Sequence, residues 1–272
     1  MVSSEPRVAR RRPNRNKLAS ASILLLGLGF TFATGGCASA PPARHEMSPE
    51  VAAAYALLER NWHAFHDLRT RADITIRQDN RSQRLDGVLL LMATSSMRFE
   101  ALSPLGTPLL VVGGDASTLT VWETMNQRAY RLAASPDATR RWLGLALGPD
   151  ELVATLSGRV VPLRNPLVAE LVPADGVGPS MSLKSAEVTQ RIWFDPADGR
   201  TKAVEWASEK TQARAVFSTT GPDAVPTRVT LATLDGKLEV LVTYREPRLN
   251  SGFDPSLVSV TLPENVRIQD FR

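Results

Sequence analysis

The chain has 272 residues, 43% of them hydrophobic, which is enough to bury a sizeable core in one large domain or two small ones. It carries 32 basic and 28 acidic residues, but six of the basic residues and one of the acidic residues fall within residues 1–36. The remaining 26 basic and 27 acidic residues have a net charge of −1, and this balance argues against nucleic acid as a partner.

Residues 1–36 have the composition of a secretion signal. The basic residues end at Lys17, and an apolar stretch follows over residues 18–33. This stretch is short for a membrane span and is followed by small residues, which is typical of a signal peptide. We therefore predict that residues 1–36 are a signal peptide.

Cys37 follows this segment and is the only cysteine of the chain, so it has no internal disulfide partner. Three interpretations are open: an incidental residue of a discarded peptide, a free thiol, or the acylated first residue of a bacterial lipoprotein. Small residues directly before the cysteine resemble the lipobox of bacterial lipoproteins, although Thr34 stands where that motif has leucine. An ordinary cleavage site exists at residues 38–40, but Pro41 would follow the cut. We favour acylation of Cys37.

A helix is expected at the start of the folded part. Residues 37–47 contain several alanines and prolines and are predicted to be a flexible tether. Ser48 then supplies a capping hydroxyl, and Pro49 occupies the first helical position. Apolar residues recur at helical spacing from there to about Leu68. We predict one domain over residues 48–272 that begins with this helix.

Strands are expected next. Apolar and polar residues alternate in residues 71–77, 96–101 and 117–122, which is typical of half-buried antiparallel strands. Residues 86–93 and 107–112 are apolar on both faces instead. A strand of that kind has both of its sides covered.

The second half continues this pattern after two short helices, expected at residues 137–147 and 149–158, and a Pro- and Gly-rich irregular segment at residues 162–183. Further strands are expected at residues 191–194, 202–208, 213–219, 227–234, 237–244, and near 258–262 and 266–271. This order predicts a mainly β (α+β) domain, in which one antiparallel sheet of about eleven strands curls round helices.

Sequence motifs of catalysis are missing. The chain has no G-x-S-x-G, no Walker-type glycine loop and no Cys-x-x-Cys, and no histidine follows His66, which argues against a Ser-His-Asp enzyme. His63 and His66 are three residues apart on the predicted helix, but without a third ligand a solvated helix face explains them better than a metal site. We predict that the protein is not an enzyme and needs no metal or cofactor.

Pro104, Leu105 and Gly106 form a turn between two predicted strands, and a spaced set of Leu, Gly and Pro residues follows further on. The members of that set are Leu143, Gly144, Leu145, Pro149, Leu152, Leu156 and Gly158. Together with the opening strands, this ordered set resembles the family of the outer-membrane lipoprotein receptor LolB. The likeness extends over about residues 48–160 and fades over residues 162–186. In the second half of the chain only the pattern of strands matches.

The resemblance implies a half-barrel capped by helices, with an apolar concave cavity for acyl chains. It implies a monomeric, lipid-anchored receptor that accepts acylated lipoproteins from a LolA-like periplasmic carrier and passes them to outer-membrane lipid. Cys37, carrying an acyl chain such as palmitate, would distinguish this receptor from its unlipidated carrier. Ala38 follows the cysteine where lipoproteins retained in the inner membrane often carry aspartate, which points to the outer membrane. The alternative is a module of the same fold that binds lipid or scaffolds the envelope without transfer.

The expected lining of the cavity consists of apolar residues of the predicted strands and one helix. These are Ile74, Leu89, Leu91, Phe99, Leu109, Val111, Leu119, Val121 and Trp142. An ordinary core beneath the helices would account for the same residues.

Leu105 is the unusual residue of the turn, because turns ordinarily present polar side chains. In the LolB family the leucine of this loop is the functional residue for lipid insertion, and the resemblance assigns Pro104, Leu105 and Gly106 to this membrane-insertion loop. The alternative is a leucine folded back onto the sheet. An exposed Leu105 is what the family resemblance implies.

Overall fold

A computed structural model describes residues 46–221 and 223–271, apart from the side chains of Trp142 and Leu143. The described elements belong to one unit, Pro42–Arg272. The predicted signal peptide, Cys37 and residues 37–45 of the predicted tether lie outside the described residues.

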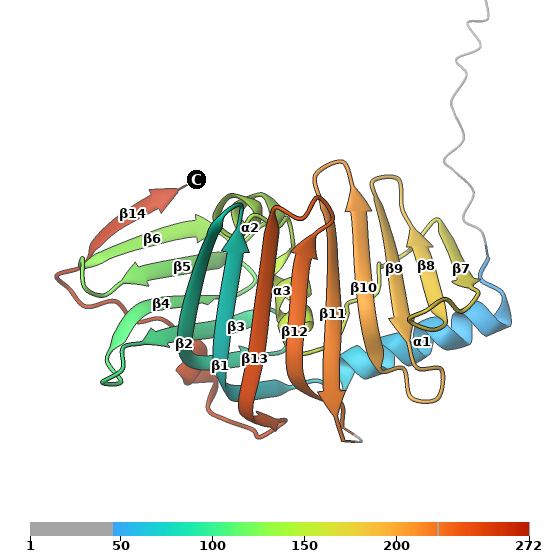
Figure 1. Cartoon of the computed structure of the whole chain (residues 1–272), viewed down its shortest axis with the longest axis horizontal. Helices are drawn as coiled ribbons and strands as arrows, with labels where there is room; N and C mark the ends of the chain where they lie inside the picture. The colour runs from blue at the N-terminus through green and yellow to red at the C-terminus, as the bar shows by residue number, and fades with distance from the viewer. Residues whose placement is uncertain (1–45, 222, 272) are drawn as a thin grey trace, which may run out of the picture. The chain divides into compact units, whose positions relative to one another are not determined.

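The described residues form a mainly β structure with one open, curled sheet and a few helices, and the predicted fold class is confirmed (Figure 1). The helices are α1 (Pro49–His63), α2 (Pro136–Leu143), α3 (Pro149–Leu156) and the short 3₁₀ helix η1 (Pro255–Val258). The strands of the first half are β1 (Asp67–Gln78), β2 (Arg81–Met92), β3 (Ser96–Leu102), β4 (Pro108–Gly114), β5 (Thr118–Glu123) and β6 (Arg128–Ala133). Those of the second half are β7 (Val168–Val172), β8 (Ser180–Lys184), β9 (Val188–Phe194), β10 (Thr201–Ser208), β11 (Gln212–Thr220), β12 (Val225–Thr233), β13 (Leu238–Leu249) and β14 (Arg267–Phe271).

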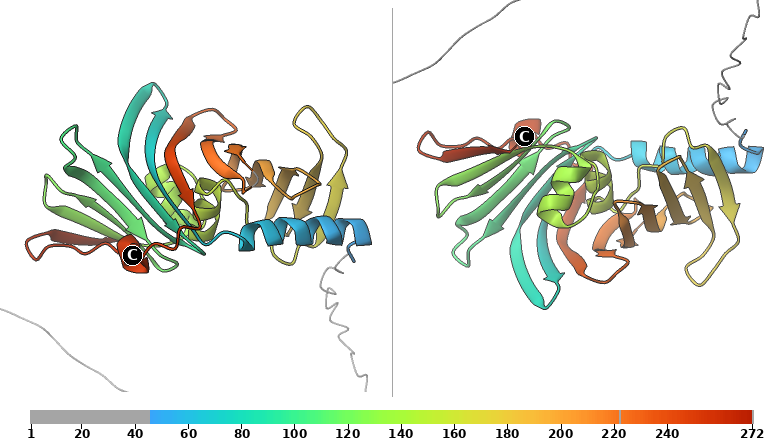
Figure 2. Two further views of the ribbon diagram at one scale, coloured as in Figure 1. Left: turned by 90° about the horizontal axis from the view of Figure 1, so that it is seen from below. Right: turned by 90° about the horizontal axis from the view of Figure 1, so that it is seen from above.

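The sheet has the order β14-β6-β5-β4-β3-β2-β1-β13-β12-β11-β10-β9-β8-β7, so β1 and β13 join its two halves. Neighbouring strands are antiparallel except β14, which runs parallel to β6. Figure 2 shows the sheet curled round α2 and α3, while α1 lies along the end that carries β7 and β8. The side of the sheet that faces these helices is called the concave face below.

The register of the strands decides which residues share the concave face. Leu89 of β2 is paired with Phe99 of β3, Phe99 with Val112 of β4, and Val112 with Val121 of β5. Paired residues of antiparallel strands point to the same side, so these four form one row. Leu89 and Phe99 are buried in a core that also includes Val153 of α3.

Helix α1 begins as predicted but is shorter. Ser48 Oγ accepts a hydrogen bond from Val51 N, yet the helix ends at His63 and not near Leu68. The chain turns because the Trp62 and Phe65 rings stack at 5.8 Å and because Asn250 donates to the carbonyl oxygen of Ala64. The apolar residues after the helix are buried through this turn and the start of β1.

The prediction of an irregular segment at residues 162–183 is wrong in part, because β7 and the larger part of β8 lie within this range. Proline and glycine are confined there to the ends of the strands and their connection. Asp175 organises this connection: its carboxylate accepts from Val177 N, Gly178 N and Trp193 Nε1. These bonds hold the pKa of Asp175 at about 2, well below its ordinary value. The sequence shows no strand signal for β6 either.

The prediction of a strand near residues 258–262 is also wrong. This segment follows η1 without joining the sheet, and it covers the face opposite to the concave face. Gly113 of β4 lies against it so closely that a Cβ atom would overlap Val260. Apolar alternation thus reflects packing here rather than strand pairing. The last expected strand is confirmed as β14.

Candidate functional site

The turn between β3 and β4 presents the candidate site residue Leu105. Ser103 Oγ accepts hydrogen bonds from Leu105 N at 3.3 Å and Thr107 N at 3.1 Å, and Gly106 N donates to the carbonyl oxygen of Ser103. Pro104 suits the second position of such a turn, and Gly106 has a φ of +80° that glycine adopts without strain. Local sequence therefore fixes this turn without help from the core.

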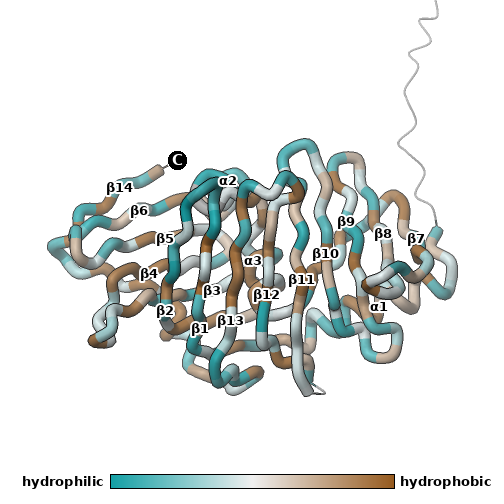
Figure 3. Tube along the Cα trace, in the orientation of Figure 1, coloured by the Kyte–Doolittle hydropathy of each residue, from teal (hydrophilic) through white to brown (hydrophobic). Residues whose placement is uncertain are grey.

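The side chain of Leu105 is 93% exposed, the highest value among the large hydrophobic residues described. The interpretation of a leucine folded back onto the sheet does not describe this structure. Figure 3 shows the loop after β3 at the end of the sheet that also carries the β5–β6 connection. An exposed leucine on a hydrogen-bonded turn can enter an apolar phase without loss of core packing.

Three expected lining residues, Leu89, Leu91 and Phe99, are buried on the concave face in one core with residues of the α2–α3 region. Ile74 of β1 is partly buried against the same core. In this structure the concave face beneath the helices is therefore filled by protein side chains, as the ordinary-core interpretation describes.

Leu109 and Val111 are a correction, because they point away from the concave face. Val111 is paired with Glu100 and Trp122, whereas Val112 is paired with Phe99. The positions of β4 that face the helices are therefore Leu110 and Val112. No signal in the sequence distinguishes the two faces of this strand, because residues 107–112 are apolar on both faces.

The concave face is less covered towards the edge of the sheet. Leu119 is buried, but Leu110, Val112, Val121 and Tyr130 are only half-buried. These four residues form a half-buried apolar strip across β4, β5 and β6. The expected lining residue Trp142 belongs to α2, but its side chain lies outside the described part of the structure.

Two clefts flank the helices. A cleft of about 480 Å³ lies between α1 and strands β7–β9, and Leu57, Leu171 and Phe194 are among its lining residues. A second cleft, of about 380 Å³, lies beside the start of α3 and is lined in part by Glu151 and Trp206. Burial raises the pKa of Glu151 there. Both volumes fall in the range of roughly 300–1,000 Å³ that is common for ligand sites.

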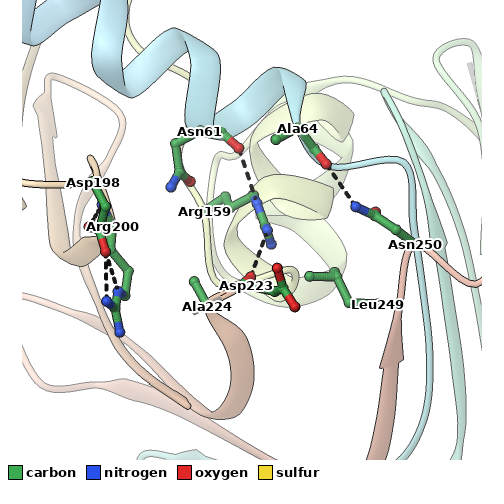
Figure 4. A pocket seen from close by; sticks show the side chains of 9 residues that line it. All are labelled: Asn61, Ala64, Arg159, Asp198, Arg200, Asp223, Ala224, Leu249 and Asn250. Atoms are coloured by element: carbon green, nitrogen blue, oxygen red, sulfur yellow. Dashed lines mark hydrogen bonds and ion pairs between the residues drawn. The ribbon is translucent and has the colours of Figure 1, made fainter. Parts of the chain in front are cut away.

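A third cleft, of about 190 Å³, is polar and smaller than that range (Figure 4). Its central residue, Arg159, is buried and donates to three backbone carbonyl oxygens, those of Asn61, Ser157 and Asp223, at 3.0–3.3 Å. Burial lowers the pKa of Arg159 to about 10. Asn61 and Ser157 lie at the carboxyl ends of α1 and α3, where a cation is favourable. Arg159 thus joins two helix ends and the β11–β12 turn.

The described residues hold no group of three or more His, Cys, Asp or Glu side chains that could bind a metal ion. His63 and His66 are both exposed. Over residues 46–221 and 223–271, no helix is long and apolar enough to cross a membrane.

An open curled sheet with helices on its concave side defines the class of fold. No protein-family model matches the chain, and no curated protein matches it. Solved structures do match. One is described as an outer membrane lipoprotein-sorting protein domain, from Vibrio parahaemolyticus: its TM-score is 0.56 at 9% identity, over 76% of this chain and 96% of that one.

Two further structures are similar. A LolA superfamily protein from Nitrosomonas europaea has a TM-score of 0.50 at 12% identity, over 76% of this chain and 97% of its own. A DUF1329 family protein from Desulfovibrio piger has a TM-score of 0.53 at 10% identity, and the match covers 78% of this chain and 98% of that protein. The chain therefore shares the fold of the LolA superfamily protein and of the lipoprotein-sorting domain.

Proposed function

We propose that the protein is a lipid-anchored receptor that accepts acylated lipoproteins from a LolA-like periplasmic carrier and inserts them into the outer membrane. The observation that carries this proposal is Leu105, 93% exposed on a turn held by its own hydrogen bonds. The fold shared with a lipoprotein-sorting domain supports it.

The physical need for such a receptor lies in the cost of moving acyl chains through water. Burying one methylene group is worth about 0.8 kcal/mol, so a chain of ~16 carbons costs on the order of 12 kcal/mol to expose. A lipoprotein needs an apolar surface along the whole route from carrier to bilayer.

In this account the half-buried apolar strip of β4–β6 is where an acyl chain first meets the sheet. Deeper binding requires α2 and α3 to move away from the core residues that they cover. The connection between these helices is bound to the β10–β11 turn, where Thr211 Oγ1 donates to the carbonyl oxygen of Ala146 at 3.1 Å. Leu145 and Leu147 of the same connection are buried in the core, so this movement exposes apolar side chains that a bound acyl chain would have to cover in their place.

Cys37 supplies the anchor in the same proposal. Acylation there, after removal of residues 1–36, would hold the domain at the periplasmic side of the outer membrane through the tether of residues 37–47.

A second candidate function is a lipid-binding or scaffolding module of the envelope without lipoprotein transfer. The apolar cleft between α1 and β7–β9 favours it, because this cleft is open to a ligand without any helix movement.

Native mass spectrometry of the purified full-length protein separates the two functions. The receptor proposal predicts a bound acylated polypeptide, whereas free lipid or no ligand supports the second candidate. The same spectra show whether Cys37 carries acyl chains; an unmodified Cys37 would contradict the lipid-anchored receptor.

A further inference from the structure

A second exposed apolar side chain lies at the same end of the sheet as Leu105. Met125, in the loop between β5 and β6, is 77% exposed. Single exposed apolar residues are common on protein surfaces. Met125 can act together with Leu105 only if its loop is joined to the Leu105 turn.

The loop of Met125 is hydrogen-bonded to the first residues of β4, the strand that follows the Leu105 turn. Thr124 N donates to the carbonyl oxygen of Leu109 at 3.2 Å, and Thr124 Oγ1 donates to that of Pro108 at 2.6 Å. Leu109 is itself 42% exposed. Three exposed apolar side chains, Leu105, Leu109 and Met125, thus belong to one structural unit, which we call the apolar tip.

The Met125 loop is also held from its other side. Asn126 Nδ2 donates to Glu123 Oε2 at 2.9 Å, and Gln127 Nε2 donates to the carbonyl oxygen of Thr124 at 3.1 Å. Arg267 N, at the start of β14, donates to the carbonyl oxygen of Gln127. A loop fixed in this way presents its methionine at little further cost in conformational entropy.

The charges around the tip follow a simple order. Residues 103–109 and 124–127 contain no charged side chain. Charged residues begin directly behind them, with Glu123 at the end of β5 and Arg128 at the start of β6. Arg128 is paired in register with Glu123 on one side and with Arg267 of β14 on the other, and the described residues provide no carboxylate within 4.0 Å of either guanidinium. The tip thus has apolar groups outermost and two arginines without an ion pair behind them. A bilayer has the complementary order, because its phosphates lie above its acyl chains.

We infer that the apolar tip is a two-loop contact for phospholipid bilayer, in which Met125 enters the membrane beside Leu105 while Arg128 and Arg267 remain at the phosphates. This inference rests on the proposed function, because it takes the Leu105 turn as a membrane contact. Two inserted loops would fix the orientation of the sheet edge on the bilayer, which a single leucine leaves free to rotate.

Depth-dependent fluorescence tests this inference. A single cysteine is introduced as Met125→Cys, Leu105→Cys or, as a control, Leu234→Cys, and is labelled with the environment-sensitive probe NBD. Leu234 is 48% exposed in the β12–β13 turn, away from the tip. Because Cys37 is the only natural cysteine, the parent chain measures any labelling there. The full-length protein is mixed with phosphatidylethanolamine–phosphatidylglycerol vesicles that contain doxyl-lipid quenchers.

The expected result is a blue shift and quenching of the probe at positions 125 and 105, and neither at position 234. A probe at position 105 that responds while the one at 125 stays in water overturns the inference and leaves the proposed function standing. If neither the probe at position 125 nor that at position 105 shows a blue shift or quenching, the membrane contact is overturned altogether. A probe at 125 that is shielded only by added carrier protein assigns the loop to a protein partner and overturns the inference too.

Side-chain substitution provides a second readout. Met125→Glu is expected to lower binding to these vesicles about tenfold, whereas Met125→Leu preserves it. Both variants retain the backbone hydrogen bonds of the loop. Equal vesicle binding by Met125→Glu and the parent protein would contradict the inference.

Discussion

Replacing Leu105 with glutamate is expected to slow the transfer of lipoproteins from carrier to membrane by about tenfold or more, because a carboxylate is costly to place in the acyl region of a bilayer. The fold should remain intact, since the leucine side chain is 93% exposed and contributes nothing to the core. The measurement is the rate at which an acylated lipoprotein moves from its carrier complex, through the receptor, into vesicles, with thermal unfolding as the check on folding.

Two variants control this experiment. Leu234→Glu introduces the same charge at an exposed leucine of another turn and should transfer normally. Leu105→Phe keeps an apolar tip and should retain transfer. Normal transfer by Leu105→Glu would end the proposal that this turn delivers lipoproteins.

Replacing Arg159 with alanine is expected to lower the free energy of unfolding by about 3 kcal/mol. The substitution leaves three carbonyl oxygens without their donor, and an unsatisfied buried polar group costs roughly 1–3 kcal/mol, part of which water in the adjacent cleft recovers. The ends of α1 and α3 also lose the cation that interacts with them. Chemical denaturation of the full-length protein measures the change.

Arg200→Ala is the matched control, because Arg200 lines the same cleft but forms only a partly exposed ion pair with Asp198 at 2.6 Å. Such pairs contribute at most about 1 kcal/mol. A loss for Arg159→Ala no larger than that for Arg200→Ala would show that Arg159 does not join the three segments.

Local signals in the sequence predicted much of the fold. The capping hydroxyl and proline at Ser48 and Pro49 mark the start of α1, and alternation marks β1 and β3. The spaced motif has a structural reason as well: Gly144 and Gly158 follow α2 and α3 with φ of +75°, and Pro149 begins α3. These features depend on neighbours in the chain, so a single sequence reveals them.

Features that depend on distant partners were not predictable in this way. After α1 the chain is held in part by Asn250, almost two hundred residues away, which binds the backbone of Ala64 and His66. β7 pairs with β8 although only five residues long, and its strand pattern is hidden among proline and glycine. The segment after η1 has the pattern of a strand but covers a sheet face.

In the candidate site, too, the features set by neighbours in the chain were predictable and those set by distant partners were not. The exposure of Leu105 follows from a turn of five residues that fixes its own geometry. The assignment of Leu109 and Val111 to the concave face required the register of β4, which the turn and a register shift between Ala101 and Leu102 determine. Met125 carried no sequence signal, because its loop resembles any polar connection until its contact with Pro108 is seen.

Binding of acyl chains to the concave face of this sheet can be tested by photo-cross-linking. A lipoprotein whose acyl chain carries a diazirine is passed from its carrier to the full-length protein, irradiated, and the adducts are mapped by mass spectrometry. We expect adducts on the half-buried apolar strip, at Leu110, Val112 and Val121. Adducts confined to the opposite face, at the exposed Leu109 and Ile268, or no adducts at all, would contradict binding to the concave face.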